Sequence, residues 1–151
     1  MLSVKRSVLG EPTNVVELRL RQNFEWRSRE GLRLFYHDAA MRKFLSYTKE
    51  VSAPGPLPNL LSRPILQAAN DSELDDVLRP EVLPSHLAAL IEAQSKGNEG
   101  YLLVTGQGNR FVIGELVVNM YWNNVKEHWV VYPWERGVYR WFGGGQTFSS
   151  A

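Results

Sequence analysis

Cysteine is absent from the 151 residues, which excludes disulfides, thiol chemistry and every cysteine-ligated metal site. Long apolar runs are missing too, since no stretch approaches the roughly 18 residues that a membrane-spanning helix needs. The first residues, MLSVKRSVLGEPT, lack the continuous apolar segment of a secretory signal. These absences favour a reducing compartment without a membrane partner, and we expect a cytoplasmic, intracellular protein.

Signatures of catalysis and metal binding are also missing. The three histidines, His37, His86 and His128, stand far apart in the sequence and show no metal-ligand spacing. The acidic residues that follow Asn70 begin like a calcium loop, but Asp76 occupies the position that requires glycine. We therefore expect no metal and no cofactor, and nothing in the sequence points to an enzyme.

Neither charge sign dominates, because the formal net charge is only +1. The charge is uneven, however: residues 1–50 carry ten Lys and Arg against six Asp and Glu, whereas residues 51–100 carry three against seven. Hydrophobic residues make up 44%, an ordinary share for a globular chain. Length and composition together predict one folded domain over 1–151, with at most a local basic surface beside an acidic one.

The N-terminal third shows a clear period of two. Apolar and charged residues alternate over 16–27, which predicts a strand with one buried face and an arginine-rich face in solvent. After 28–31 the alternation resumes at Leu32 and Leu34, and this indicates the return strand of a hairpin.

The middle of the chain changes to helical spacing interrupted by prolines. A helix is expected over 38–50, and a capping pattern at 72–75 predicts a second, short one. A third helix is expected between Pro84 and Gly97. Four prolines lie in 52–64, a stretch that we expect to be an extended internal connector, because proline fixes φ and removes a donor.

From Tyr101 onward the sequence predicts a meander of short strands. A turn is expected at Gly106–Asn109, since a phosphate-binding loop would need a further glycine and a following helix. The glycine-rich end, 143–151, predicts a flexible tail. The predicted fold is a single α+β domain, with an antiparallel sheet made of an N-terminal β-hairpin and a C-terminal meander. Two to three helices are expected to lie mainly on one face of the sheet.

Aromatic residues concentrate in 119–145, which contains four of the five tryptophans. Alternation directs Tyr132 and Trp134 to one face of a strand and Trp129 to the other. A sheet covered on one face needs one of these sets for its core. The second set is then expected under a helix, in an interface or against a ligand.

Rings accompanied by arginine are the composition enriched at protein interfaces. The leading hypothesis is therefore a non-enzymatic interaction module of the adaptor type that binds a protein partner through this sheet surface. The proposed partner-binding residues are Trp129, Trp134, Tyr139, Arg140 and Trp141. Association of two copies through the same strands stays open, because it would use the same aromatic face.

Two alternative functions were considered. The basic strand face could bind single-stranded nucleic acid, with phosphates on arginine and bases on nearby rings; its residues are Arg19, Arg21, Arg27 and Arg33. Glutamates interrupt this row, so cross-strand charge pairing explains it equally well. The other alternative is a small-molecule or catalytic pocket between the sheet and the helices, for which a histidine beside a carboxylate would be the sign.

Overall fold

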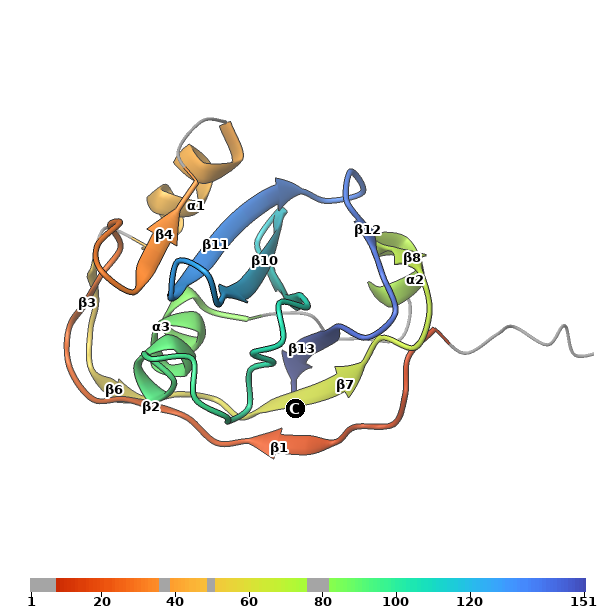
Figure 1. Ribbon diagram of the computed structural model, residues 1–151, viewed down its shortest axis with the longest axis horizontal. Coiled ribbons are helices and arrows are strands. Elements are labelled where there is room, and N and C mark those ends of the chain that lie inside the picture. The colour runs from red at the N-terminus through yellow and green to blue at the C-terminus, as the bar shows by residue number, and fades with distance from the viewer. Residues whose placement is uncertain (1–7, 36–38, 49–50, 76–81) are drawn as a thin grey trace, which may run out of the picture.

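The computed structural model describes residues 8–35, 39–48, 51–75 and 82–151. In these ranges a seven-stranded mixed sheet has the order β1-β7-β13-β9-β10-β11-β4 (Figure 1). Its strands are β1 (Asn14–Val16), β4 (Leu32–Leu34), β7 (Leu60–Pro64), β9 (Asn109–Ile113), β10 (Leu116–Asn123), β11 (His128–Glu135) and β13 (Gln146–Ser150). The helices are α1 (Ala39–Thr48), α2 (Asp71–Asp75) and α3 (Pro84–Ala93). The predicted α+β class is confirmed.

Three short two-stranded ladders complete the described elements. They pair β2 (Arg19–Leu20) with β6 (Gly55–Pro56), β3 (Phe24–Glu25) with β5 (Val51–Ser52), and β12 (Arg140–Trp141) with β8 (Ala69–Asn70). The N-terminal segment thus runs antiparallel to the proline-containing one, through β1–β7, β2–β6 and β3–β5. The expected connector over 52–64 is therefore corrected: much of it is strand.

The expected N-terminal hairpin is wrong, although the predicted alternation of buried residues is present. Val16, Leu20 and Trp26 are buried, as the period of two requires. But β4 pairs in parallel with β11, with Leu32 opposite Trp129, and does not return along β3. Alternation determines which side chains are buried, whereas the choice of partner strand depends on contacts distant in sequence.

One face of the sheet is closed by α1 and α3. In Figure 1 the chain passes from β1 through β2 and β3 to β4 around α3. Leu87, Ala88 and Leu90 of this helix are fully buried, as are Met41 and Phe44 of α1. These side chains form one large core with the inward side chains of β9, β10 and β11. No helix in the described residues is long and apolar enough to cross a membrane.

The opposite face is covered only in part, by α2, β8 and β12. Leu74, Val112, Val117 and Trp141 form a second, smaller buried cluster there. The expectation of helices mainly on one face therefore holds for α1 and α3, while α2 lies on the other side. A capping box begins α2, in which Asn70 Oδ1 accepts from the Glu73 amide and Glu73 Oε1 accepts from the Asn70 amide. It lies two residues before the predicted start.

The C-terminal end differs most from the expectation. The predicted flexible tail over 143–151 is corrected, because β13 lies inside the sheet between β7 and β9. Phe148 is fully buried and stacks on Phe111 with 4.7 Å between the ring centroids. Few apolar residues mark this strand in the sequence, so its burial depends on the neighbours that it finds in the fold.

The expected meander is also incomplete. Residues 101–108 form no strand in the structure. Gln94 holds this segment by bonding both backbone groups of Leu102, and Asn109 bonds both backbone groups of Leu103. The last expected strand, now β12, pairs with β8 and not with β11, which leaves part of β10 and β11 open on the second face.

Candidate functional site

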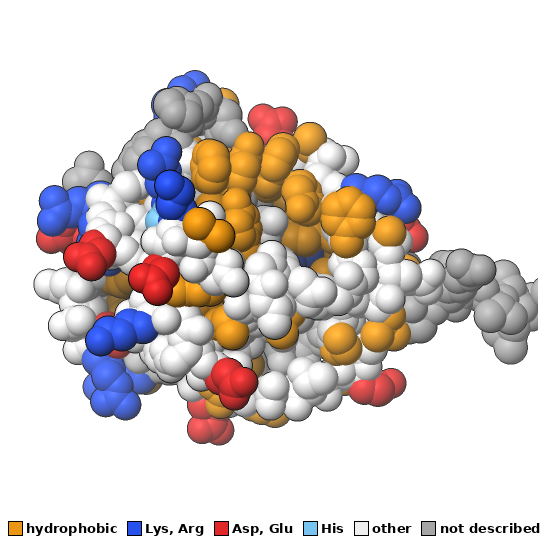
Figure 2. Space-filling view, viewed as in Figure 1, with side chains coloured by type: hydrophobic (Ala, Val, Ile, Leu, Met, Phe, Trp, Pro, Cys, Tyr) orange, Lys and Arg blue, Asp and Glu red, His pale blue; other side chains and the backbone are white. Residues whose placement is uncertain are grey.

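Five aromatic side chains form a continuous row on the second face of the sheet. We call the row Phe35–Tyr132–Trp134–Tyr139–Trp141 the aromatic ladder. Its successive ring centroids lie 4.5, 4.4, 5.1 and 4.6 Å apart. Figure 2 shows apolar side chains gathered above β11 on this face, with Lys and Arg side chains to either side. Rings at these distances gain both from burial and from contact between their π-systems.

Strand geometry explains the positions of the first three rings of the aromatic ladder. Tyr132 and Trp134 alternate with inward residues of β11, so both project from the same face. Phe35 directly follows β4 and stacks on Tyr132, while the Arg33 guanidinium lies 5.9 Å from the Phe35 ring centroid. The parallel pairing of β4 with β11 is therefore what extends the row to this edge of the sheet.

A buried ion-pair network positions the last two rings of the aromatic ladder. Arg110, fully buried on β9, donates to Asp71 at 2.9 Å and to Asp75 at 2.8 Å. Asp71 in turn accepts from Trp141 Nε1 at 2.9 Å and from the Gly137 amide at 2.7 Å. This network fixes the segment after β11 on α2 and so directs Tyr139 and Trp141 back towards Trp134. Such a buried charge is tolerated because it is paired and hydrogen-bonded.

A groove of about 510 Å³ lies beside the aromatic ladder. Side chains of Tyr121, Tyr132, Trp134, Tyr139 and Phe142 line it, with Asn119 and the glycine-rich loops 106–108 and 143–145. None of the described residues that line it is charged. The groove is therefore aromatic and polar but neutral.

The glycines of the two loops allow a close approach of backbone. A Cβ atom at Gly145 would lie 2.9 Å from the Gly108 carbonyl oxygen, and one at Gly108 would lie 2.6 Å from Asn119 Oδ1. Gly144 has φ 101°, a conformation that glycine adopts without strain. Side chains at these positions would push the loops apart or fill the space above Asn119. The hairpin turn expected at Gly106–Asn109 is therefore corrected: no strand directly precedes it, and residues 106–108 form a wall of the groove.

Two buried polar atoms at the groove have no hydrogen-bond partner among the described residues, Asn119 Oδ1 and Trp134 Nε1. Neighbouring groups of the same chemistry are fully bonded. The side-chain amide of Asn109 makes four hydrogen bonds, and Trp141 Nε1 donates to Asp71. An unsatisfied buried polar group costs about 1–3 kcal/mol, so one acceptor and one donor left unpaired in one groove require an explanation.

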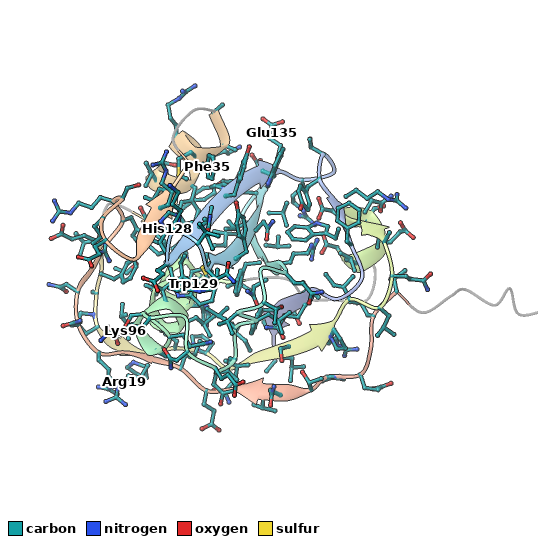
Figure 3. All side chains as sticks on the ribbon, viewed as in Figure 1. Arg19, Phe35, Lys96, His128, Trp129 and Glu135 are labelled. Atoms are coloured by element: carbon teal, nitrogen blue, oxygen red, sulfur yellow. The ribbon has the colours of Figure 1, made fainter. Side chains whose placement is uncertain are left out.

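The groove offers neutral hydrogen-bonding groups. Burial raises the pKa of Tyr121, and the nearby Tyr139 and Tyr132 raise it further, so its hydroxyl stays protonated and able to donate. Burial lowers the pKa of His128, helped by the charges of Arg33 and Lys126, but His128 does not line the groove. Figure 3 shows His128 on the same face, at the other end of β11 from Glu135.

The described residues that line the groove include no histidine and no charged side chain. The described residues contain no cluster of three or more His, Asp or Glu able to hold a metal ion. The expected pocket between sheet and helices is not where the groove lies, since α1 and α3 cover the opposite face. The histidine expected in such a pocket was His37 or His128, and of these His37 lies outside the described residues. What the described side chains offer here is contact with rings and neutral hydrogen bonds.

The structure separates the five predicted partner-binding residues. Trp129 is fully buried, donates from Nε1 to the Gln94 carbonyl at 2.8 Å, and belongs to the core on the helix face. Its assignment to a binding surface is therefore corrected. Trp134 and Tyr139 are half-buried and line the groove, Trp141 forms its floor at 2% exposure, and Arg140 is exposed.

Sequence reasoning missed Asn119, Tyr121 and Phe142. A signal existed for the first two, because alternation along β10 places them on one face. Asn119 is the register partner of Tyr132, but that pairing is known only from the fold. Phe142 is 68% exposed at the rim of the groove.

The four arginines of the nucleic-acid hypothesis do not form one surface. Arg19 lies on β2 and Arg33 on β4; in Figure 3, Arg19 is far from Phe35, the ring beside Arg33. Arg27 pairs with Glu25 at 2.8 Å, both of them exposed. The basic strand face is therefore divided between separate parts of the molecule, and part of it is used in charge pairing.

The fold and the groove together define a small α+β domain that carries a neutral aromatic groove on the partly covered face of its sheet. Comparisons with models of protein families, with curated proteins and with solved structures found no match. The function of the groove is accordingly inferred from its own geometry.

Proposed function

We propose that the protein is a non-enzymatic interaction module that binds a segment of a partner protein in the aromatic groove. The observation that carries this proposal is the pair of unpaired buried atoms, Asn119 Oδ1 and Trp134 Nε1, in a groove lined by rings. Both atoms are covered in the free protein, so a partner that displaces the covering groups, and supplies a donor to the first and an acceptor to the second, would satisfy both.

The composition of the groove supports binding to protein. Trp and Tyr are the residues most enriched at the energetic centres of protein interfaces, and the groove contains four of them with partly exposed rings: Tyr121, Tyr132, Trp134 and Tyr139. Nucleic acid is less well matched, because phosphates require cations and none of the described lining residues is charged. Catalysis has no support either, since the described lining contains no carboxylate and no histidine.

Site-specific photo-crosslinking in an extract of the source cells tests the proposal. A photoreactive phenylalanine analogue replaces Phe142 at the rim of the groove or, as the control, Val125, which is 85% exposed in the turn between β10 and β11. We expect position 142 to give a protein adduct of one defined mass that position 125 does not give.

Dependence on the groove is the decisive part of this experiment. The adduct should survive nuclease and should disappear in Trp134→Ala and Asn119→Leu variants that remain folded by circular dichroism. Equal adducts at positions 142 and 125, or an adduct that both groove variants retain, would refute the proposed function.

A further inference from the structure

We infer that the occupant of the groove is an extended, uncharged, proline-containing segment of the partner, bound in the polyproline II conformation. This inference rests on the proposed function and specifies its ligand. Three properties of the groove carry it: its neutrality, the orientation of its rings, and the chemistry of its unpaired atoms.

Neutrality excludes a charged ligand from the groove itself. Arg33 lies over Phe35 at one end of the aromatic ladder, and Arg110 is paired with Asp71 and Asp75 at the other. Arg140 is exposed between Tyr139 and Trp141 in the chain but does not line the groove. A charged side chain that entered the groove would lose water without gaining an opposite charge, which is strongly unfavourable. The residues that the groove accepts are accordingly apolar or neutral.

Ring orientation argues against a flat ligand that stacks. Tyr132 is nearly parallel to Phe35 (20°) and to Trp134 (12°), with centroids 4.5 and 4.4 Å away, so the two neighbours occupy its two faces. Trp134 also contacts Tyr139 at 5.1 Å with a tilt of 45°. Bases bind by stacking on open ring faces, whereas the centre of the aromatic ladder presents ring edges.

A groove with ridges of aromatic side chains can bind proline residues between the ridges. Polyproline II segments dock on aromatic-lined grooves, where their rings fit between aromatic side chains, and their stiffness reduces the entropy lost on binding. The edges of Tyr132, Trp134 and Tyr139, together with Phe142, which also lines the groove, provide such ridges. The glycine-rich loops 106–108 and 143–145 leave room for the backbone of the segment.

The unpaired atoms match the backbone of such a segment. Polyproline II has no internal hydrogen bonds, so its carbonyls are free to accept and its non-proline amides are free to donate. Both atoms are covered in the free protein, and Gly108 lies against Asn119 Oδ1. Once the segment displaces the covering groups, Trp134 Nε1 can donate to a carbonyl and Asn119 Oδ1 can accept from a non-proline amide. The protonated Tyr121 hydroxyl supplies a second donor. The segment therefore contains both prolines and at least one non-proline residue.

A subtractive selection tests the inference. A phage-displayed library of random twelve-residue peptides is depleted on immobilised Asn119→Leu protein and then selected on the wild-type chain. We expect enriched sequences with clustered prolines and no charge in the common motif. Replacing the prolines of a selected peptide by alanine should weaken binding on the order of tenfold or more.

Indole NMR signals locate the bound peptide. The Trp134 Nε1–H signal of ¹⁵N-labelled protein should shift on titration, whereas that of Trp26, bonded to Ser52 at 3.0 Å on the other face, should not. A Trp134→Phe variant keeps a ring and loses the donor, and it should bind the peptide roughly tenfold more weakly. An unshifted Trp134 signal, or unchanged affinity in Trp134→Phe, would overturn the inference.

The failure of the inference can be told apart from that of the proposed function. Enriched peptides that lack proline or carry charge in the motif, but lose binding in Asn119→Leu, would overturn the inference and leave the groove a protein-binding site. The absence of such peptides, together with a groove-dependent adduct at position 142, would have the same meaning. The absence of both would overturn both proposals, as would a neutral oligosaccharide that shifts the Trp134 signal.

Discussion

Trp129 and Trp134 stand on the same strand and end in opposite environments. Trp129 faces α1 and α3, is fully buried, packs against Trp122 and donates its Nε1–H to the Gln94 carbonyl. Trp134 faces the other way, is half-buried, and has a buried Nε1–H without a partner among the described residues. The helix face of the sheet is closed by α1 and α3, whereas the opposite face is covered only where α2, β8 and β12 reach.

The difference shows how a rich supply of rings is divided between stability and recognition. On the helix face the rings are needed to exclude water from a large core. On the other face the aromatic ladder remains partly exposed, and Trp134 Nε1 and the neighbouring Asn119 Oδ1 have no hydrogen-bond partner among the described residues. Native structures break packing and hydrogen-bonding rules mainly where function requires it, so the second face is the one that we assign to binding.

Truncating each of the two tryptophans to alanine should give the largest difference between the two faces, in stability and in binding. Trp129→Ala should lower the free energy of unfolding by about 5 kcal/mol, since it leaves a large cavity in a closed core. Trp134→Ala should cost less than about 2 kcal/mol and should abolish binding of a selected peptide. Urea denaturation and a binding titration measure both quantities. Equal destabilisation by the two variants would contradict the distinction between closed and open faces.

The ion-pair network that shapes the groove should be the next most sensitive element. Asp71→Ala leaves the Arg110 charge buried and removes the acceptor of Trp141 Nε1, so it should cost about 3 kcal/mol. It should also shift the Trp141 indole signal, which reports on the floor of the groove. The control is Glu115→Ala, which breaks the exposed pair with Lys43 and should leave the unfolding midpoint unchanged. A similar midpoint for both variants would argue against the network.

Two buried asparagines give a finer comparison. Asn109→Leu deprives four hydrogen-bonding groups of their partner and should cost about 2 kcal/mol or more. Asn119→Leu removes an oxygen with no partner among the described residues, so stability should stay the same or rise while peptide binding is lost. Thermal denaturation of both variants checks this. A large loss of stability in Asn119→Leu would show that the oxygen has a structural role.

The smallest expected effect is the contribution of His86, on the helix face, to the pH dependence of stability. Burial lowers the pKa of His86, although the hydrogen bond from its Nε2 to the Pro58 carbonyl opposes this shift. Because the folded pKa lies below the ordinary value of about 6.5, the neutral form stabilises the fold above that pH, and this stability is lost as pH falls through the folded pKa. The slope for one proton cannot exceed about 1.4 kcal/mol per pH unit. His86→Gln should flatten the decline measured between pH 7 and pH 5; an unchanged slope would assign the decline to other groups.

Local pattern was sufficient to predict several elements. Spacing of apolar residues predicted the helices found at α1 and α3, and alternation predicted that Tyr132 and Trp134 lie opposite Trp129. It also indicated that aromatic residues occupy both faces of β11. These features depend on contacts within a few residues, where the period of the chain is decisive.

The candidate site needed more than local pattern. Which tryptophan is core and which lines a groove depends on which face α1 and α3 cover, and sequence alone assigned Trp129 to the wrong one. The groove itself depends on Arg110 reaching Asp71, 39 positions away, and on the chain returning to place 143–145 beside Gly108. Neither contact leaves a periodic signal.

The sequence by itself determined the class of fold, the absence of cysteine chemistry and the face to which each ring of β11 points. Tertiary structure alone decided the parallel pairing of β4 with β11, the insertion of β13 into the sheet, and the unpaired state of Asn119. The physical reason is the sequence distance over which each property is determined. A side chain's direction is set by the backbone dihedrals of its own strand, whereas its burial and its hydrogen-bond partners are set by segments that the sequence holds far apart.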